Sequence, residues 1–204
     1  MEPPVESTLQ PTAQPTAQSA PQSAPQSAPP AARATIPLVA VVMGVSGTGK
    51  STIGLLLAHR LGWPFAEGDD FHSAANVAKM HAGHPLDDAD RGPWLTAIAE
   101  WIGTREQTGQ SAVITCSALK RSYRDRLRAD HPGVRFIALI GSRDLIAQRL
   151  EHRGGHFMPP ALLQSQLDTL EPLQPDEPGG TVDVGQSPEQ IEAAALAILA
   201  GIAG

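Results

Sequence analysis

The segment GVSGTGKST, residues 44–52, follows the apolar run PLVAVVM and constrains the fold more than any other part of the chain. It matches the pattern Gly-x-x-x-x-Gly-Lys-Ser, in which a glycine-rich loop joins a buried strand to a helix. The glycines let the backbone turn its N–H groups toward anionic oxygens, and the helix that begins near Gly49 adds the positive end of its dipole. The segment therefore predicts a phosphate-binding loop.

This loop predicts a site for ATP and Mg²⁺. Lys50 is expected to reach the β- and γ-phosphates, and the hydroxyl of Ser51 is expected to hold the magnesium ion. The residues predicted to bind the nucleotide are Gly44, Ser46, Gly47, Thr48, Gly49, Lys50, Ser51 and Thr52.

Two absences narrow the class of nucleotide-binding protein. GTPases that recognise their base carry an Asn-Lys-x-Asp element, and the only asparagine of this chain, Asn76, stands in NVAK. Motor-type ATPases usually have an apolar strand that ends in Asp or Glu, whereas SAVIT is followed here by CSALK. The sequence therefore favours a kinase that acts on a small molecule.

The first 34 residues differ in composition from the rest of the chain. They form an imperfect repeat of Pro, Ala, Gln, Ser and Thr with almost no large apolar residue. Such a segment cannot bury enough apolar surface to offset the entropy lost on ordering. We expect residues 1–34 to be a disordered tail and residues 35–204 to be one P-loop kinase domain.

Composition also bears on location and partners. The tail lacks the basic start and apolar stretch of an export signal, and no run is long enough to span a bilayer. The net charge of -6 argues against a nucleic-acid partner, and the single cysteine, Cys116, excludes an internal disulfide. We expect a cytoplasmic enzyme with no membrane association.

Apolar runs alternate with segments of helical periodicity along the folded part. This alternation is typical of an α/β fold with a parallel sheet covered by helices on both faces. Strands are predicted within 37–43, 63–68, 111–118, 134–141 and 180–185. Helices are predicted over 50–61, 74–82, 94–104, 119–130, 143–152, 161–170 and from 188, with residues 83–92 forming a polar turn.

Two carboxylates follow the short second strand, in the segment EGDD. A kinase needs a group that orients the acceptor hydroxyl and takes its proton, and it needs carboxylates near the metal. Glu67 and Asp69 are two residues apart, so on a continuing strand both would point the same way, toward the phosphate loop. The alternative, a solvated acidic turn, explains the segment equally well.

Three basic residues are candidates for binding an acidic substrate. Arg91 could clamp a carboxylate or a phosphate, or it could pair with a neighbouring aspartate in the segment DDAD. Lys120 and Arg124 open a helix directly after a strand, on the side of the sheet where ligands bind. As a bare charge run, the same helix would simply be a solvated face.

A second group of basic residues lies near the glycines of RGGHFM. Arg149 and Arg153 are four residues apart and share one helix face, so they could neutralise charge on the transferred phosphoryl group from a closing flap. The alternative is a helix C-terminus with favourable cations and a glycine stop. The irregularly spaced histidines match no zinc pattern, so no metal beyond magnesium is predicted.

Taken together, these stretches resemble the gluconokinases, P-loop sugar-acid kinases related in fold to shikimate and adenylate kinases. The matching segments span roughly residues 38–184, nearly all of the folded part, and KMHAGHPLDDADRGPWL is the most specific. The segments are MGVSGTGKST, GDDFH, NVAKMHAGHPLDDADRGPWL, VITCSALKRSYRDRLR and RGGHFMPPALLQSQLDTLEPL.

This resemblance implies five parallel strands, a helical substrate-binding region after the second strand, a mobile lid near Arg153, and often a homodimer. It implies transfer of the γ-phosphate of ATP to the 6-hydroxyl of D-gluconate. The implied catalytic residues are Lys50, Asp69 and Arg153. Arg149 joins the nucleotide-binding residues, and Ser51 and Glu67 serve the metal. The implied substrate-binding residues are Asp69, Arg91, Lys120, Arg124 and His156.

The chain departs from the family pattern at two positions. Glu67 stands where the family usually has Asp, and Ser73 stands where it usually has Pro. Two other readings stay open. One is a shikimate-type or other small-acid kinase on the same fold, and the other is a non-catalytic ATP-binding regulator.

Overall fold

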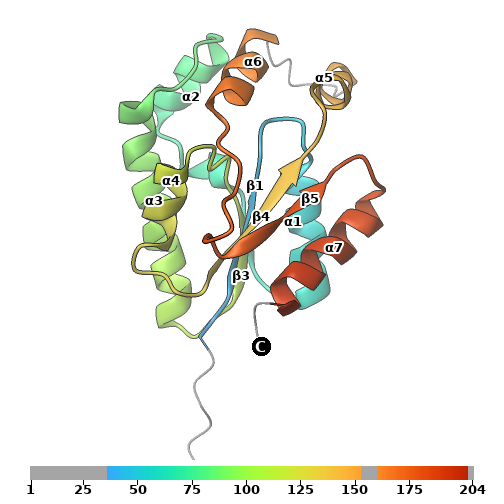
Figure 1. Cartoon of the computed structure of the whole chain (residues 1–204). Coiled ribbons are helices and arrows are strands. Elements are labelled where there is room, and N and C mark those ends of the chain that lie inside the picture. The colour runs from blue at the N-terminus through green and yellow to red at the C-terminus, as the bar shows by residue number, and fades with distance from the viewer. Residues whose placement is uncertain (1–35, 153–159, 202–204) are drawn as a thin grey trace, which may run out of the picture. The chain divides into compact units, whose positions relative to one another are not determined.

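The computed structural model describes residues 36–152 and 160–201, and within them it shows one parallel sheet (Figure 1). The five strands lie in the order β2-β3-β1-β4-β5. They are β1 (Val39–Met43), β2 (Phe65–Ala66), β3 (Ala112–Thr115), β4 (Val134–Ile140) and β5 (Gly179–Asp183). The predicted α/β fold with five parallel strands is confirmed.

Helices cover both faces of this sheet (Figure 1). They are α1 (Lys50–Leu61), α2 (Ala74–His81), α3 (Asp88–Gln107), α4 (Arg121–Arg128), α5 (Arg143–Glu151), α6 (Pro160–Thr169) and α7 (Pro188–Gly201), with a 3₁₀ turn, η1 (Gly68–Phe71). None of these described helices is long and apolar enough to cross a membrane.

Strand β1 lies at the centre of the sheet, and every one of its residues is buried. Val41 faces α3 and α4 in one apolar cluster, whereas its neighbour Val42 faces α1 and α7 in a second cluster. Because successive side chains point to opposite faces, a strand covered on both sides must be apolar throughout. This explains the unbroken run VAVVM that precedes the phosphate loop.

The main departure from the predicted elements is the start of α3. Residues 83–92 were predicted to be a polar turn, but the helix already begins at Asp88. Asp87 caps it: its carboxylate accepts a bond from the N–H of Asp90 at 2.9 Å, and the Asp90 carboxylate accepts one from the N–H of Asp87 at 2.9 Å. This reciprocal capping box starts the helix before Gly92 and Pro93. Arg91 therefore projects from a first helical turn.

A smaller apolar cluster lies beside the phosphate loop. It contains Val45 of the loop, Leu119, Ile146 of α5 and Leu163 of α6. These residues are buried, so α5 and α6 both pack against the loop that joins β1 to α1. The cluster positions two helices around the candidate site.

Candidate active site

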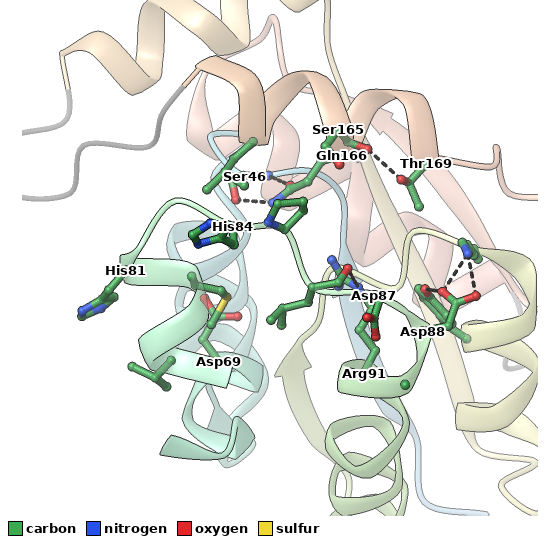
Figure 2. A pocket seen from close by; sticks show the side chains of 18 of the residues that line it. Ser46, Asp69, His81, His84, Asp87, Asp88, Arg91, Ser165, Gln166 and Thr169 are labelled. Atoms are coloured by element: carbon green, nitrogen blue, oxygen red, sulfur yellow. Dashed lines mark hydrogen bonds and ion pairs between the residues drawn. The ribbon is translucent and has the colours of Figure 1, made fainter. Parts of the chain in front are cut away.

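A cavity of about 1350 Å³ opens beside the phosphate loop (Figure 2). Its wall combines the loop, the start of α1, η1, α2, the start of α3, the start of α4, the end of α5, and α6. Six of the residues predicted from sequence line it: Ser46, Ser51, Glu67, Asp69, Arg91 and Lys120. The structure thus brings together predicted residues from four separate stretches of sequence.

The phosphate loop has the backbone that the glycine pattern predicts. Gly47 and Gly49 have φ values of 86° and 91°, which side chains disfavour. At Gly44, a Cβ atom would lie 2.6 Å from the carbonyl oxygen of Leu139 in β4. Position 44 therefore requires glycine for two reasons. Strand β4 leaves no room for a Cβ atom, and the φ of 140° disfavours any side chain.

Side chains brace this loop from within. The hydroxyl of buried Thr48 donates to the carbonyl of Val45 at 2.8 Å, and Lys50 Nζ donates to the same carbonyl at 3.2 Å. An ammonium group has three donors, so the bond to the Val45 carbonyl is compatible with further partners. Thr52 follows in the first turn of α1.

Glu67 and Asp69 line the cavity together, although the chain does not continue as a strand between them. It turns into η1 at Gly68, where a Cβ atom would lie 2.0 Å from the carbonyl oxygen of Thr115. The predicted continuation of the strand was therefore wrong, but Glu67 and Asp69 do line the same cavity, as predicted. The turn forms because the chain crosses directly over the end of β3.

Hydrogen bonds hold this turn in place. The Thr115 hydroxyl donates to the carboxylate of Glu67 and accepts a bond from the N–H of Gly68 at 3.0 Å. The indole N–H of Trp94 donates to the carbonyl of Gly68 at 2.7 Å. Because the backbone of Gly68, directly before it, is held at both its N–H and its carbonyl, Asp69 is presented to the cavity from a fixed support.

Glu67 and Ser51 fit a magnesium ion. Both line the same cavity, and they offer a carboxylate and a hydroxyl oxygen. Mg²⁺ prefers oxygen ligands and usually binds through one or two protein groups, with waters and substrate phosphates completing the set. The longer side chain of Glu67 is oriented by Thr115, which supports the predicted role despite the departure from Asp.

Arg91 faces the cavity without a carboxylate partner among the described residues. Its guanidinium donates to the carbonyl of Leu86 at 3.3 Å and contacts the Ser117 hydroxyl at 3.5 Å. The alternative reading placed it in an ion pair with a neighbouring aspartate. Instead, Lys79 pairs with Asp87 and Asp90, and Lys120 pairs with Asp88.

Lys120 lines the cavity but is already engaged. Its Nζ contacts both oxygens of Asp88, at 2.7 and 2.9 Å, and the hydroxyl of Tyr123 donates to the same carboxylate. Two hydrogen bonds lower the pKa of Asp88, and the one from Lys120 has a larger effect than the one from Tyr123. Asp88 therefore stays charged and competes with any anionic ligand for Lys120.

Arg124 does not line the cavity, and its predicted role in substrate binding was wrong. Its side chain is completely buried and forms two bonds to Glu177, at 2.6 Å from Nε and 2.9 Å from Nη2. Lys120 is the N-cap of α4 and has extended backbone, so the four-residue spacing does not place the two cations on one helix face. Arg124 instead anchors the segment that follows α6.

We expect Arg124→Ala to reduce the free energy of unfolding by about 3–5 kcal/mol, because the buried Glu177 carboxylate would lose its ion-pair partner and keep only the bond from the N–H of Gln174. Urea denaturation measures this loss. The double variant Arg124→Met, Glu177→Leu should recover most of it, since no unpaired charge remains. Unchanged stability combined with a higher KM for a sugar acid would restore the role that the sequence suggested.

The remaining predicted residues lie elsewhere. Arg149 donates to the carbonyl of Val184 at 2.7 Å, which ties α5 to the end of β5, and its contact with nucleotide stays a prediction. Arg153 and His156 lie outside the described residues. Sequence reasoning missed Gln166 of α6, which lines the cavity and contacts Ser46.

The residues that line the cavity define a class of protein. A phosphate loop, the carboxylates of Glu67 and Asp69, the Ser51 hydroxyl and the Arg91 guanidinium share one cavity on a parallel sheet. This is the arrangement of a P-loop kinase for a small molecule.

Comparison with known proteins identifies the particular family, although no family model matches the sequence. The chain is 54% identical over 142 residues to a gluconokinase of Gluconobacter oxydans, covering 70% of this chain and 80% of that relative. It is 45% identical over 181 residues to a probable gluconokinase of Rattus norvegicus, covering 80% and 98%. The crystal structure of a gluconokinase from Sinorhizobium meliloti superposes with a TM-score of 0.73 at 48% identity, covering 82% and 94%. The chain belongs to the gluconokinase family.

Proposed function

We propose that this chain transfers the γ-phosphate of ATP to the 6-hydroxyl of D-gluconate, forming 6-phospho-D-gluconate and ADP. The observation that carries the proposal is the shared cavity of Asp69, Arg91 and the phosphate loop. Gluconate has a primary hydroxyl at one end and a carboxylate at the other, so its site needs an acceptor for a proton and a separate cation. Membership of the gluconokinase family supports this substrate.

In this mechanism the loop N–H groups and Lys50 bind the phosphates of ATP. Ser51 and Glu67, the latter directly or through a water, would hold Mg²⁺, which would supply positive charge to the phosphates of ATP. Asp69 orients the 6-hydroxyl and takes its proton while the O6–Pγ bond forms and the bond from Pγ to the β,γ-bridging oxygen breaks. ADP leaves with that bridging oxygen.

We assign the gluconate carboxylate to Arg91. Arg124 is consumed by Glu177, and Lys120 is shared with Asp88, so Arg91 is the cavity-lining arginine that keeps its charge available among the described residues. A guanidinium can bind a carboxylate through two parallel hydrogen bonds. Lys120 serves as a second contact at the same end of the substrate.

The test is a coupled assay of ADP release with gluconate, glucose and shikimate as acceptors. We expect kcat/KM for gluconate to exceed that for glucose by at least about 100-fold, because glucose lacks a carboxylate and leaves Arg91 unpaired. Equal rates on the two sugars would contradict the proposal. Preference for shikimate would support a different small-acid kinase, and ATP binding without turnover would support a regulator.

Arg91→Ala separates substrate binding from nucleotide binding in the same assay. It should raise KM for gluconate and leave the slow reaction with glucose unchanged, so the ratio of kcat/KM for gluconate to that for glucose falls.

The family resemblance also implies a homodimer, and sedimentation of the pure protein tests that proposal. That residues 1–34 form a disordered tail and that the protein is cytoplasmic both stay predictions.

A further inference from the structure

One glutamine of α6, Gln166, forms hydrogen bonds to the phosphate loop. The backbone N–H of Ser46 donates to Oε1 of Gln166 at 2.7 Å, and Nε2 of Gln166 donates to the Ser46 hydroxyl at 3.2 Å (Figure 2). One amide thus bonds both the backbone and the side chain of the same loop residue, across 120 positions of sequence. Both residues line the cavity.

Apolar packing places Gln166 there. Leu163 is buried against Val45 of the loop, and Leu167 and Leu170 pack against the same cluster. Positions 163, 166, 167 and 170 share one face of a helix, so Gln166 is the polar member of an otherwise leucine-rich face. When the leucines of α6 pack against this cluster, the amide of Gln166 therefore faces the phosphate loop.

The chain that follows α6 is anchored as well. The N–H of Glu171 donates to the carbonyl of Leu119 at 2.8 Å, and Arg124 donates to the carbonyl of Glu171 at 3.0 Å. On the other side of the loop, a Cβ atom at Gly47 would lie 2.8 Å from Leu150 of α5. The loop is therefore held between α5 and a firmly attached α6.

The chemistry of the amide suits a neighbour of phosphate. A carboxylate at this position would repel the nucleotide, whereas a neutral amide oxygen accepts one N–H without adding charge. Gly47 and Gly49 donate no backbone hydrogen bond within the described residues, so the contact involves Ser46 and spares the glycine N–H groups. Gln166 braces the edge of the loop and leaves its centre to the phosphates.

We propose that Gln166 is a positioning residue for phosphoryl transfer, which holds α6 against Ser46 so that the γ-phosphoryl group meets the sugar hydroxyl rather than water. The proposal rests on the proposed function. Water can attack the same phosphorus, forming an O–P bond, breaking the bond to the bridging oxygen and releasing ADP and inorganic phosphate. A loop and helix held in contact limit that reaction, because they exclude water and fix the angle of attack.

The test compares Gln166→Leu and Gln166→Asn with Gln164→Leu and Gln164→Asn. Asparagine keeps the amide but is shorter by one carbon–carbon bond, about 1.5 Å, so it cannot reach Ser46. Gln164 lies on the same helix, bonds Asp168 and does not line the cavity, which makes it a matched control. Each variant is assayed for 6-phosphogluconate and for ADP, and its melting temperature is measured.

We expect both Gln166 variants to lower kcat by about tenfold or more and to form less than one phosphogluconate per ADP, while both Gln164 variants stay at the wild-type ratio. A wild-type ratio and kcat in Gln166→Asn, or a change in melting temperature alone, would overturn the proposal. A wild-type enzyme that forms no phosphogluconate would instead overturn the proposed function. The two failures are therefore distinguishable.

Discussion

Lys50→Ala is expected to lower kcat by about 10²–10³-fold while the protein stays folded. Lys50 begins α1, and its Nζ lies across the phosphate loop, where it donates to the carbonyl of Val45 at 3.2 Å. An ammonium at this position stabilises the negative charge that builds on the β,γ-bridging oxygen during transfer. Alanine removes the ammonium group and its bond to the Val45 carbonyl, while Thr48 still donates to that carbonyl and the glycines keep their backbone conformation.

Steady-state assays with saturating ATP and gluconate measure this effect, and thermal unfolding verifies the fold. Lys79→Ala is the matched control, because Lys79 lies on α2 and pairs with Asp87 and Asp90, whereas Lys50 bonds the phosphate loop. Its kcat should stay near that of the wild type. Activity of Lys50→Ala within about tenfold of wild type would mean that Lys50 does not meet the transferred phosphate.

The elements around the phosphate loop could be predicted because local signals agree there. Helix α1 has the predicted bounds, Lys50–Leu61, and the residue after it, Gly62, has the positive φ of a helix C-terminus. The start of α3 could not be predicted in the same way. Gly92 and Pro93 suggest a break, and the capping box between Asp87 and Asp90 outweighs them.

Pairing between distant residues explains the errors in the site. From sequence, Arg124 resembles a ligand-binding cation, but in the structure its guanidinium is paired with Glu177, which lies 53 positions away. Gln166 was missed because nothing in its own segment shows that Ser46 lies next to it. Its place among the leucines at 163, 167 and 170 was the available signal, since a polar residue on an apolar helix face needs a partner.

Asp69 lines the cavity, but a different backbone geometry from the predicted one places it there. The prediction relied on the alternation of side chains along a strand, but η1 replaces that strand. Two tertiary hydrogen bonds place Asp69 instead, by holding Gly68: one to the Thr115 hydroxyl and one from the indole of Trp94. The residue type was informative because a kinase of this kind needs a carboxylate there, whatever backbone presents it.

Asp69→Asn should lower kcat by about 10²–10⁴-fold and leave KM for ATP nearly unchanged. Asparagine has the same shape and can still accept a hydrogen bond from the 6-hydroxyl, but its amide cannot take the proton. The O6–Pγ bond would then have to form at a protonated, poorly nucleophilic oxygen. Because η1 is held by backbone contacts of Gly68, the substitution should not disturb the turn.

Asp70→Asn is the matched control for this prediction. Asp70 is the next residue of η1 and is exposed, but it does not line the cavity. Turnover of the two variants on gluconate, with ATP saturating, should therefore differ by most of the Asp69 effect. If Asp69→Asn turned over at the wild-type rate, the proton would have another acceptor, and Glu67, which lines the same cavity, would become the residue to replace next.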